Sequence, residues 1–369
     1  MLAELERHPH ARAVLGPALD NPARPSHAYL FHGPGGAGKR AAARALAAEL
    51  LAEGEADPEG ARVRVMHGTH PDLTWVVPSG AHEMLVSDID GPVISAASKT
   101  PFESSRRVFV IERADELGDE AANRMLKTLE EPASFVHLIL LTDRLGEILP
   151  TIRSRCQMVR FEPPREEDAA AALRELGVAA DTALACTRLA LQDAERAYEL
   201  ARSDGQALRA TAERYARCAL AGEMSVARPW ADLLAAVRAR GEAAAAELEG
   251  LKDAELELTA RKEQKRVTTE WDERIRRSRR RVQTGALDLA LQLLSLWFAD
   301  LACLGYGAED LVRNCDRRTE LDADAGIDPV RLRRAVELVE DTRERFLLNV
   351  SEDLACEALA YRLQQTLLG

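Results

Sequence analysis

Aromatic residues are scarce in this chain of 369 residues. Phe, Trp and Tyr together make up 4% of it, whereas 46% is hydrophobic and 30% is charged, and Ala, Leu, Arg and Glu are abundant. Such a composition favours helix over sheet outside any compact α/β core. The length exceeds what one compact core usually holds, so it predicts two or three domains.

Clustered cysteines are also missing. The six cysteines are Cys156, Cys186, Cys218, Cys303, Cys315 and Cys356. No two of them have a CxxC or CxxxC spacing, so neither a disulfide framework nor a cysteine-based zinc cluster is suggested. We expect reduced thiols in the cytosol.

The chain has neither a long apolar run nor an excess of positive charge. Its first residues, MLAELERHPH, contain no apolar signal core, and the most apolar stretch, residues 287–304, is interrupted by Asp288, Gln292 and Asp300. We therefore expect neither export nor a membrane span. The net charge of −12 argues against a protein that coats DNA with its whole surface, so a DNA contact must be local or supplied by partners.

Five short apolar runs fall between helical patterns in the first half of the chain. They comprise residues 28–31, 73–77, 108–111, 136–141 and 158–161. Strands that alternate with helices predict a parallel sheet covered on both faces. The sequence Glu162-Pro163-Pro164 ends this part, because proline removes a ladder donor. Only helical periodicity follows, which predicts a small helical domain at 164–210 and a larger all-helical domain at 211–369.

The last domain contains helix-start signals and an abrupt change of charge. Helices are expected to begin at Asp328-Pro329 and at Ser351-Glu352-Asp353. Residues 242–257 carry six acids and one lysine, whereas residues 261–281 carry ten Lys or Arg and four acids. This pattern fits a solvated helical hairpin with mutually attracting arms, or a basic arm that contacts DNA or a partner.

Residues 33–40, GPGGAGKR, have the G-x-x-x-x-G-K spacing of a phosphate loop, after strand-like AYLF and before a helical pattern. The glycines of the loop are Gly33, Gly35, Gly36 and Gly38. Glycines allow successive backbone N–H groups to point at phosphates near a helix N-terminus, and Lys39 supplies the positive charge. The sequence therefore predicts a nucleotide-type site.

Two residues that such a site needs are missing. Arg40 stands where a Ser or Thr hydroxyl normally binds Mg²⁺, and a guanidinium has no acceptor. After the third predicted strand, Glu112 is followed by Arg113 instead of the acid that polarises the attacking water. We interpret the loop as decayed; an active ATPase with unusual ligands is the alternative.

Four further stretches carry a family resemblance. They are HAYLF (27–31), THPDL (69–73), ANRMLKTLEEP (122–132) and TIRSRC (151–156). In this order and spacing they resemble the bacterial DNA polymerase III clamp-loader subunits, gamma/tau and delta-prime, strongly over residues 1–205. The resemblance implies an AAA+ core at 1–163, a helical lid at 164–210 and a helical collar at 211–369, the latter including the charged hairpin at about 242–281.

The resemblance also implies a function and partners. Gamma/tau keeps the catalytic loop and delta-prime loses it, so Arg40 and Arg113 indicate the delta-prime type, without ATPase activity of its own. Expected partners are gamma/tau and delta subunits, the sliding clamp and primer-template DNA, at a nucleoid-associated replisome in the cytoplasm and away from membranes. The alternatives are a gamma/tau-like ATPase with unusual ligands and a non-replicative AAA+ binding module.

Particular residues acquire roles by the same resemblance. Arg155 of TIRSRC matches the arginine finger that reaches the ATP of an adjacent subunit; the alternative is an ordinary ion pair before the fifth strand. Thr142 matches the sensor-1 position. Arg196, in QDAERAYELA, matches the sensor-2 arginine, although without a hydrolysable nucleotide an ordinary helix or interface role is favoured.

The chain also departs from the family. Relatives usually have four cysteines between the phosphate loop and THPD, whereas EADPEGARVRVMHGTHPD has none. We therefore expect no zinc and no other metal, since His67 and His70 lack thiolate neighbours. No cofactor is required, and weak binding of ATP or ADP through Lys39 is left open.

Overall fold

The computed structural model describes residues 5, 8–20, 25–80, 83–258, 261–346 and 350–369. The chain divides into two compact units, Met1–Pro164 and Arg165–Gly369. The division falls directly after the Pro163-Pro164 pair. Each unit is described by itself below, and the finer separation of residues 164–369 into a lid and a collar stays a prediction.

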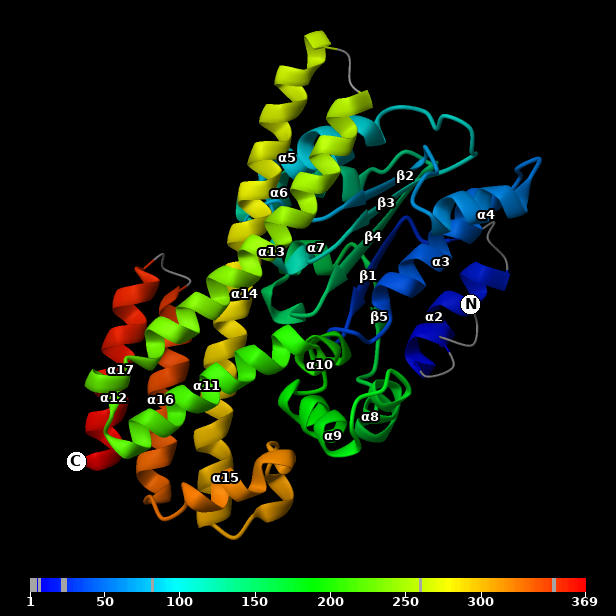
Figure 1. The fold of residues 1–369 in the computed structure, drawn as a ribbon. Helices are drawn as coiled ribbons and strands as arrows, with labels where there is room; N and C mark the ends of the chain where they lie inside the picture. The colour runs from blue at the N-terminus through cyan, green and yellow to red at the C-terminus, as the bar shows by residue number, and fades with distance from the viewer. Residues whose placement is uncertain (1–4, 6–7, 21–24, 81–82, 259–260, 347–349) are drawn as a thin grey trace. The chain divides into compact units, whose positions relative to one another are not determined.

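The first unit contains one parallel five-stranded sheet (Figure 1). Its strands are β1 (Ala28–His32), β2 (Leu73–Val76), β3 (Arg107–Ile111), β4 (Val136–Thr142) and β5 (Gln157–Arg160). They are ordered β2-β3-β4-β1-β5, and all paired neighbours run parallel. The five strands predicted from the apolar runs are confirmed. Every residue of β4 is buried, which explains why its sequence is apolar apart from His137 and Thr142.

Helices cover both faces of this sheet, and each face has its own core. Alternate residues of β1 show the division, since Phe31 faces one core and Leu30 the other. The core with Phe31 is completed by α2 (Pro9–Asp20), α3 (Lys39–Ala52) and α4 (Pro58–Met66). The core with Leu30 is completed by α5 (Val86–Ile89), η1 (Asp90–Ser95), α6 (Asp119–Glu130) and α7 (Pro150–Arg153). Two 3₁₀ turns, η2 (Ala114–Glu116) and η3 (Leu145–Glu147), follow β3 and β4.

The second unit is helical, and its described residues contain no strand. Its first helices are α8 (Glu166–Glu175), α9 (Ala180–Leu189), α10 (Ala194–Ala201), α11 (Ser203–Ala221), α12 (Met224–Ala227) and α13 (Pro229–Leu258). They are followed by α14 (Arg261–Gly305), η4 (Glu309–Leu311), η5 (Cys315–Arg317), α15 (Arg318–Ala323), α16 (Pro329–Phe346) and α17 (Glu352–Leu368). One continuous core, which includes the buried Trp297, runs from α8 to α17.

Both helix starts predicted in this unit are confirmed. The Asp328 Oδ1 atom accepts a hydrogen bond from the Val330 amide at 3.0 Å, directly before α16, and Ser351 precedes α17. Two acids occupy the first turn of α17, where they favour the helix dipole. These acids also pair with distant arginines, Glu352 with Arg280 and Asp353 with Arg238.

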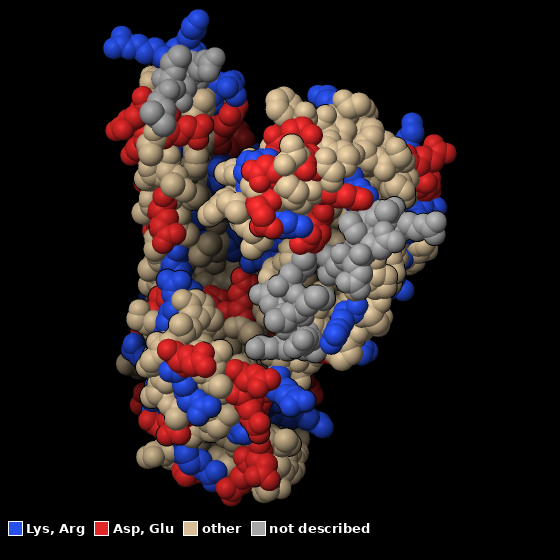
Figure 2. Space-filling view, turned by 90° about the vertical axis from the view of Figure 1, so that its right-hand side faces the viewer, with Lys and Arg blue, Asp and Glu red and all other residues tan. Residues whose placement is uncertain are grey.

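Helices α13 and α14 form a hairpin that has a small core of its own, made by Ala245, Val267, Trp271 and Ile275. At the top left of Figure 2, basic side chains project from its tip and acidic ones lie just below. Arg279 lies 3.5 Å from Glu242, so one basic residue of α14 meets an acid of α13. In a second pair, Lys252 of α13 is the base and Asp272 of α14 is the acid. Direct ion pairs between the two arms therefore run in both directions, with a base on either helix.

Helix α14 is also long and apolar enough over Gln264–Gly305 to cross a membrane by length and composition. Of its most apolar window, 72% is buried inside the protein. The apolar face therefore packs in the core of the second unit, around Trp297 and Phe298.

Candidate functional site

The phosphate loop connects β1 to α3 and depends on glycine at three of its four glycine positions. Gly33, Gly36 and Gly38 have φ values of 147°, 70° and 84°, which side chains disfavour. At Gly33 a Cβ atom would lie 2.3 Å from the Phe161 carbonyl oxygen, so glycine is also required by the close approach of the chain after β5. Gly35 shows no such backbone requirement. The predicted order of strand, loop and helix is present.

Lys39 is held by oxygen atoms of the protein itself. Its Nζ donates to the carbonyls of Gly33 and Pro34, each at 2.6 Å, and lies 2.7 Å from Asp143 Oδ1. The residue is 6% exposed. A phosphate group would have to compete with these three acceptors for the ammonium. The Lys39 ammonium is therefore bound by the loop's own carbonyls and by Asp143, in the place where a phosphate would bind it.

Arg40 binds the acid at the end of β3. Its Nε and Nη2 atoms lie 2.8 and 2.6 Å from Glu112 Oε2, and Trp75 Nε1 donates to Glu112 Oε1 at 2.6 Å. The Glu112 side chain is 8% exposed. Both carboxylate oxygens are thus bound by donors from α3 and β2, so Glu112 has no free oxygen directed at a metal or a water.

Arg113, the next residue, has an unusual backbone conformation. Its φ of 51° and ψ of 50° place it in the left-handed region, which is unfavourable for a residue with a side chain. Its Nη2 lies 2.7 Å from Glu116 Oε1, and Glu116 is itself buried. A paired guanidinium thus occupies the position where an active site would present a carboxylate to water.

Thr142, at the end of β4, is buried and fully engaged. Its hydroxyl donates to Asp115 Oδ1 at 2.8 Å and accepts from the Arg144 amide at 3.0 Å. Arg144 Nε in turn binds Asp115 Oδ2 at 2.9 Å. These bonds join the turns after β3 and β4. A sensor role for Thr142 stays a prediction, and it requires the hydroxyl to leave Asp115.

Arg155 follows α7 and precedes β5, at the surface of the first unit. Its Nη2 lies 2.5 Å from Glu130 Oε1, and its Nη1 donates to the Thr151 carbonyl at 2.9 Å and to Ser154 Oγ at 3.2 Å. The ion pair that was the alternative to an arginine finger is therefore present. The finger role itself stays a prediction. Burial raises the pKa of the neighbouring Cys156 thiol to about 12, so that thiol is unreactive at neutral pH.

Arg196 belongs to the second unit. Its backbone amide is capped by Asp193 Oδ1 at 2.9 Å, at the start of α10, and its guanidinium donates to Gln292 Oε1 of α14. Gln292 is 4% exposed. Arg196 therefore links two helices of its own unit, and its sensor-2 role stays a prediction.

The sequence assigned no role to Asp72, although it lies in THPDL. This carboxylate is completely buried and accepts hydrogen bonds from the amides of Phe102, Glu103 and Ser104 at 2.6 to 2.9 Å. It thereby fixes the loop before β3 and presents Phe102, which is 83% exposed. The only sequence signal was the motif, because the three bonded amides lie about thirty residues away.

The histidines weighed as metal ligands serve other purposes. His70 Nδ1 accepts from the Asp72 amide at 3.2 Å, and its Nε2 lies 3.2 Å from Glu103 Oε1. Burial lowers the pKa of His70, which favours the neutral ring. His67 ends α4. Within the described residues, no group of three His, Cys, Asp or Glu side chains has an arrangement able to hold a metal ion.

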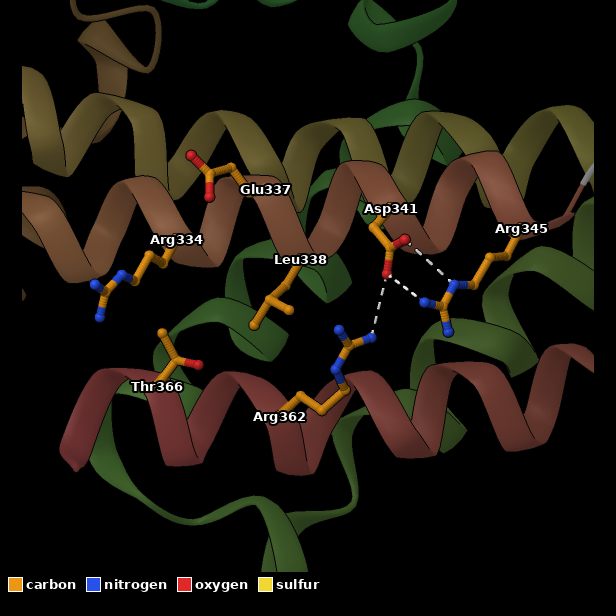
Figure 3. A pocket seen from close by; sticks show the side chains of 7 residues that line it. All are labelled: Arg334, Glu337, Leu338, Asp341, Arg345, Arg362 and Thr366. Atoms are coloured by element: carbon orange, nitrogen blue, oxygen red, sulfur yellow. Dashed lines mark hydrogen bonds and ion pairs between the residues drawn. The ribbon is translucent and has the colours of Figure 1, made fainter.

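The second unit contains an open hollow between α16 and α17, with a volume of about 490 Å³ (Figure 3). Its lining residues are Arg334, Glu337, Leu338, Asp341, Arg345, Arg362 and Thr366. Asp341 Oδ2 lies 3.0 Å from Arg345 Nη2 and 3.3 Å from Arg362 Nη1, so one carboxylate is shared by two of the three lining arginines. Its two acids, Glu337 and Asp341, do not belong to any group of three His, Cys, Asp or Glu side chains within the described residues that could hold a metal ion.

The sheet order β2-β3-β4-β1-β5, with a phosphate loop directly after β1, defines an AAA+ type of P-loop domain followed by a helical region. The sequence model of the family described as "DNA polymerase III, delta subunit" matches residues 11–165. Over this part of the chain, the predicted resemblance to the delta-prime subunits of DNA polymerase III is confirmed by the family model and by the relatives that follow.

The chain is 38% identical over 189 residues to "DNA polymerase III subunit delta'" of Bacillus subtilis, covering 49% of this chain and 55% of the relative. It is 32% identical over 197 residues to the protein of the same name from Escherichia coli, covering 51% and 58%. A "DNA polymerase III subunit gamma/tau" of Mycobacterium tuberculosis is 33% identical over 177 residues, covering 44% and 29%. The chain thus spans about half the length of these delta-prime relatives.

Among solved structures, a DNA polymerase III gamma subunit-related protein from Thermotoga maritima aligns with 96% of this chain and 99% of its own. The identity is 15% and the TM-score 0.45. The assignment of the fold rests on the strand order and on the loop, not on this alignment.

Proposed function

We propose that this chain is a delta-prime-type subunit of a DNA polymerase III clamp loader that does not hydrolyse ATP itself. The observation that carries the proposal is the joint replacement at the phosphate loop. Arg40 binds Glu112 where a hydroxyl normally holds Mg²⁺, and Arg113 binds Glu116 where an acid normally polarises water. The relatives named delta' support the same function.

Electrostatics favours this function over a working ATPase. Phosphoryl transfer needs a cation that bridges the phosphates and an acceptor that orients the attacking water. A guanidinium at position 40 repels a divalent cation, and the Glu112 oxygens are already engaged by Arg40 and Trp75. The retained Lys39 leaves weak binding of ATP or ADP open, without hydrolysis.

The chain acts instead on a neighbour's ATP site. Arg155 is the candidate arginine finger, and it lies partly exposed, with a side-chain exposure of 33%. A planar guanidinium suits the charge spread over a transferring phosphoryl group. In this proposal gamma/tau holds the ATP, delta and the sliding clamp complete the assembly, and the complex loads the clamp onto primed DNA in the bacterial cytoplasm.

Reconstitution tests the function. The purified chain is mixed with gamma/tau and delta subunits, and ATP hydrolysis and clamp loading onto primed DNA are measured with and without it. We expect no turnover by the chain alone and clamp loading only when it is present. Turnover by the isolated chain that Lys39→Ala abolishes would establish a gamma/tau-like ATPase, and failure to assemble with gamma/tau would establish a different AAA+ binding module.

A further inference from the structure

Two motifs of the first unit meet at a single ion pair. Glu130 is the last residue of α6 in the LKTLEEP stretch, and Arg155 follows α7 in the SRC stretch, 25 residues later. Glu130 Oε1 lies 2.5 Å from Arg155 Nη2. The other terminal nitrogen, Nη1, is bound by the Thr151 carbonyl and Ser154 Oγ. The guanidinium is thus both oriented and neutralised within its own chain.

The position of Glu130 is unfavourable for the helix that carries it. Helix α6 ends at Glu130, where backbone carbonyls make the helix end negative and an acid is repelled. The pair is also exposed, with 47% exposure of the Glu130 side chain and 33% of Arg155. Exposed ion pairs contribute little to folding. Neither the helix nor the fold therefore accounts for a carboxylate at this point.

A weak, exposed pair can be exchanged readily for a stronger one. A nucleotide γ-phosphate carries more negative charge than a carboxylate and offers several acceptor oxygens, so it competes well for one guanidinium. While Arg155 stays on Glu130, its charge is already balanced and its Nη2 is occupied. Binding to a phosphate requires this bond to break.

We propose that Glu130 is a positioning residue that holds Arg155 in a neutralised resting state and releases it only to the phosphate of a nucleotide on the adjoining subunit. This inference rests on the proposed arginine-finger function. The Glu130 carboxylate sets the ATP concentration at which the neighbouring site captures Arg155. Arg155 leaves Glu130 when a terminal phosphate competes for its guanidinium, and Arg155 returns to Glu130 after that phosphate is lost. Glu130 thereby tunes how strongly the neighbouring site responds to ATP without touching ATP itself.

The adjacent glutamate provides a matched control. Glu131 has the same charge and lies one residue further along, in the C-cap position, and it is exposed. No ion pair of Glu131 is found among the residues that the structure describes. Glu130→Gln and Glu131→Gln therefore remove the same charge from nearly the same place, and only the first removes the partner of Arg155.

The test uses the reconstituted full complex with wild-type chain, Glu130→Gln, Glu131→Gln or Arg155→Ala. ATP hydrolysis stimulated by clamp and DNA is followed as a function of ATP concentration, together with the thermal stability of each isolated chain. For Glu130→Gln we expect the half-saturating ATP concentration of the affected site to fall about two- to fivefold, the range that an exposed ion pair allows, with kcat nearly unchanged. Glu131→Gln should match wild type.

The outcomes separate this inference from the proposed function. If Arg155→Ala changes neither hydrolysis nor clamp loading, the finger function fails and the inference fails with it. If Arg155→Ala slows the complex but Glu130→Gln behaves like Glu131→Gln, the finger stands and the role of Glu130 is refuted. If Glu130→Gln lowers only the melting temperature, leaving the ATP dependence unchanged, Glu130 is merely a structural contact and the inference is equally overturned.

Discussion

Arg40 and Glu112 are 72 residues apart in the sequence and form an ion pair at the mouth of the phosphate loop, with Nη2 and Oε2 2.6 Å apart. The pair joins the first turn of α3 to the end of β3. The positively charged Arg40 side chain therefore lies against Glu112, the acid that would otherwise assist a metal ion. Two consequences of this arrangement, one for catalysis and one for stability, are testable on the isolated chain.

The first prediction concerns catalysis. Arg40→Thr restores the hydroxyl of an ordinary phosphate loop, yet we expect no ATP turnover, because Arg113 still replaces the water-polarising acid. Phosphate release measured with excess ATP and Mg²⁺ checks this. The double variant Arg40→Thr with Lys39→Ala serves as the background. Turnover in the single variant that disappears in the double variant would show that position 40 alone disables the site.

The second prediction concerns stability. Arg40→Thr removes two donors from a carboxylate whose side chain is only 8% exposed, so we expect a loss of about 1–3 kcal/mol in the free energy of unfolding. Urea unfolding at pH 7 measures it. Arg124→Thr, which breaks pairs with exposed Glu120 and Asp90, is the control and should cost less than about 1 kcal/mol. Equal losses would mean that the Arg40 pair is an ordinary surface contact.

The third prediction concerns metal content. We expect the purified chain to carry no stoichiometric zinc, because the segment 55–72 contains no cysteine and both ring nitrogens of His70 contact Asp72 or Glu103. Elemental analysis after dialysis against a chelator decides the point. One zinc ion per chain, lost together with a stable fold in His70→Ala, would show that a histidine site had been overlooked.

The fourth prediction concerns Arg155. Replacing it by alanine should leave the chain folded and assembled, since its contacts are exposed, but should slow ATP-dependent clamp loading by the complex. Loss of an arginine finger typically costs about 10³–10⁵ in rate at the site it serves, although total hydrolysis falls less because other sites remain. Clamp loading is the sharper assay. Wild-type loading by the variant, beside failure of the equivalent gamma/tau variants, would assign Arg155 a structural role.

The fifth prediction concerns the pH dependence of folding. Burial lowers the pKa of His137 to about 4; the ring is 2% exposed, its Nδ1 lies 3.0 Å from the Ser26 carbonyl, and it stacks on His27. The unfolded chain therefore binds this proton more readily than the folded one between about pH 6.5 and 4. Stability is fully present above pH 6.5 and falls as the pH drops towards 4, by about 2 kcal/mol between pH 8 and pH 5.

Denaturant unfolding at several pH values tests the role of His137. His137→Phe should lose about 2 kcal/mol of this pH dependence, whatever its stability at pH 8, because phenylalanine cannot bind a proton. His67→Phe, at the end of α4, is the control and should keep the wild-type slope. The same slope in wild type and His137→Phe would assign the acid sensitivity to other groups.

Local signals in the sequence were sufficient to predict where the strands, two helix starts and the phosphate loop lie. The apolar runs located all five strands to within about two residues, and the central strands β1, β3 and β4 are almost wholly buried, as strands covered on both faces of a parallel sheet must be. Proline and acid signals located the starts of α16 and α17. The glycine spacing located the phosphate loop, since the left-handed conformations at Gly36 and Gly38 strongly favour glycine.

The partners of the charged side chains were decided only by the tertiary structure. The sequence by itself placed Lys39, Arg40 and Arg155 in recognisable motifs and showed which expected ligands are missing. Their partners Asp143, Glu112 and Glu130 come from other elements, brought together by the order β2-β3-β4-β1-β5 and by the helices packed on the sheet. Apolar periodicity shows that a strand is buried but not which strands are its neighbours, so no pattern along the chain predicts these pairs.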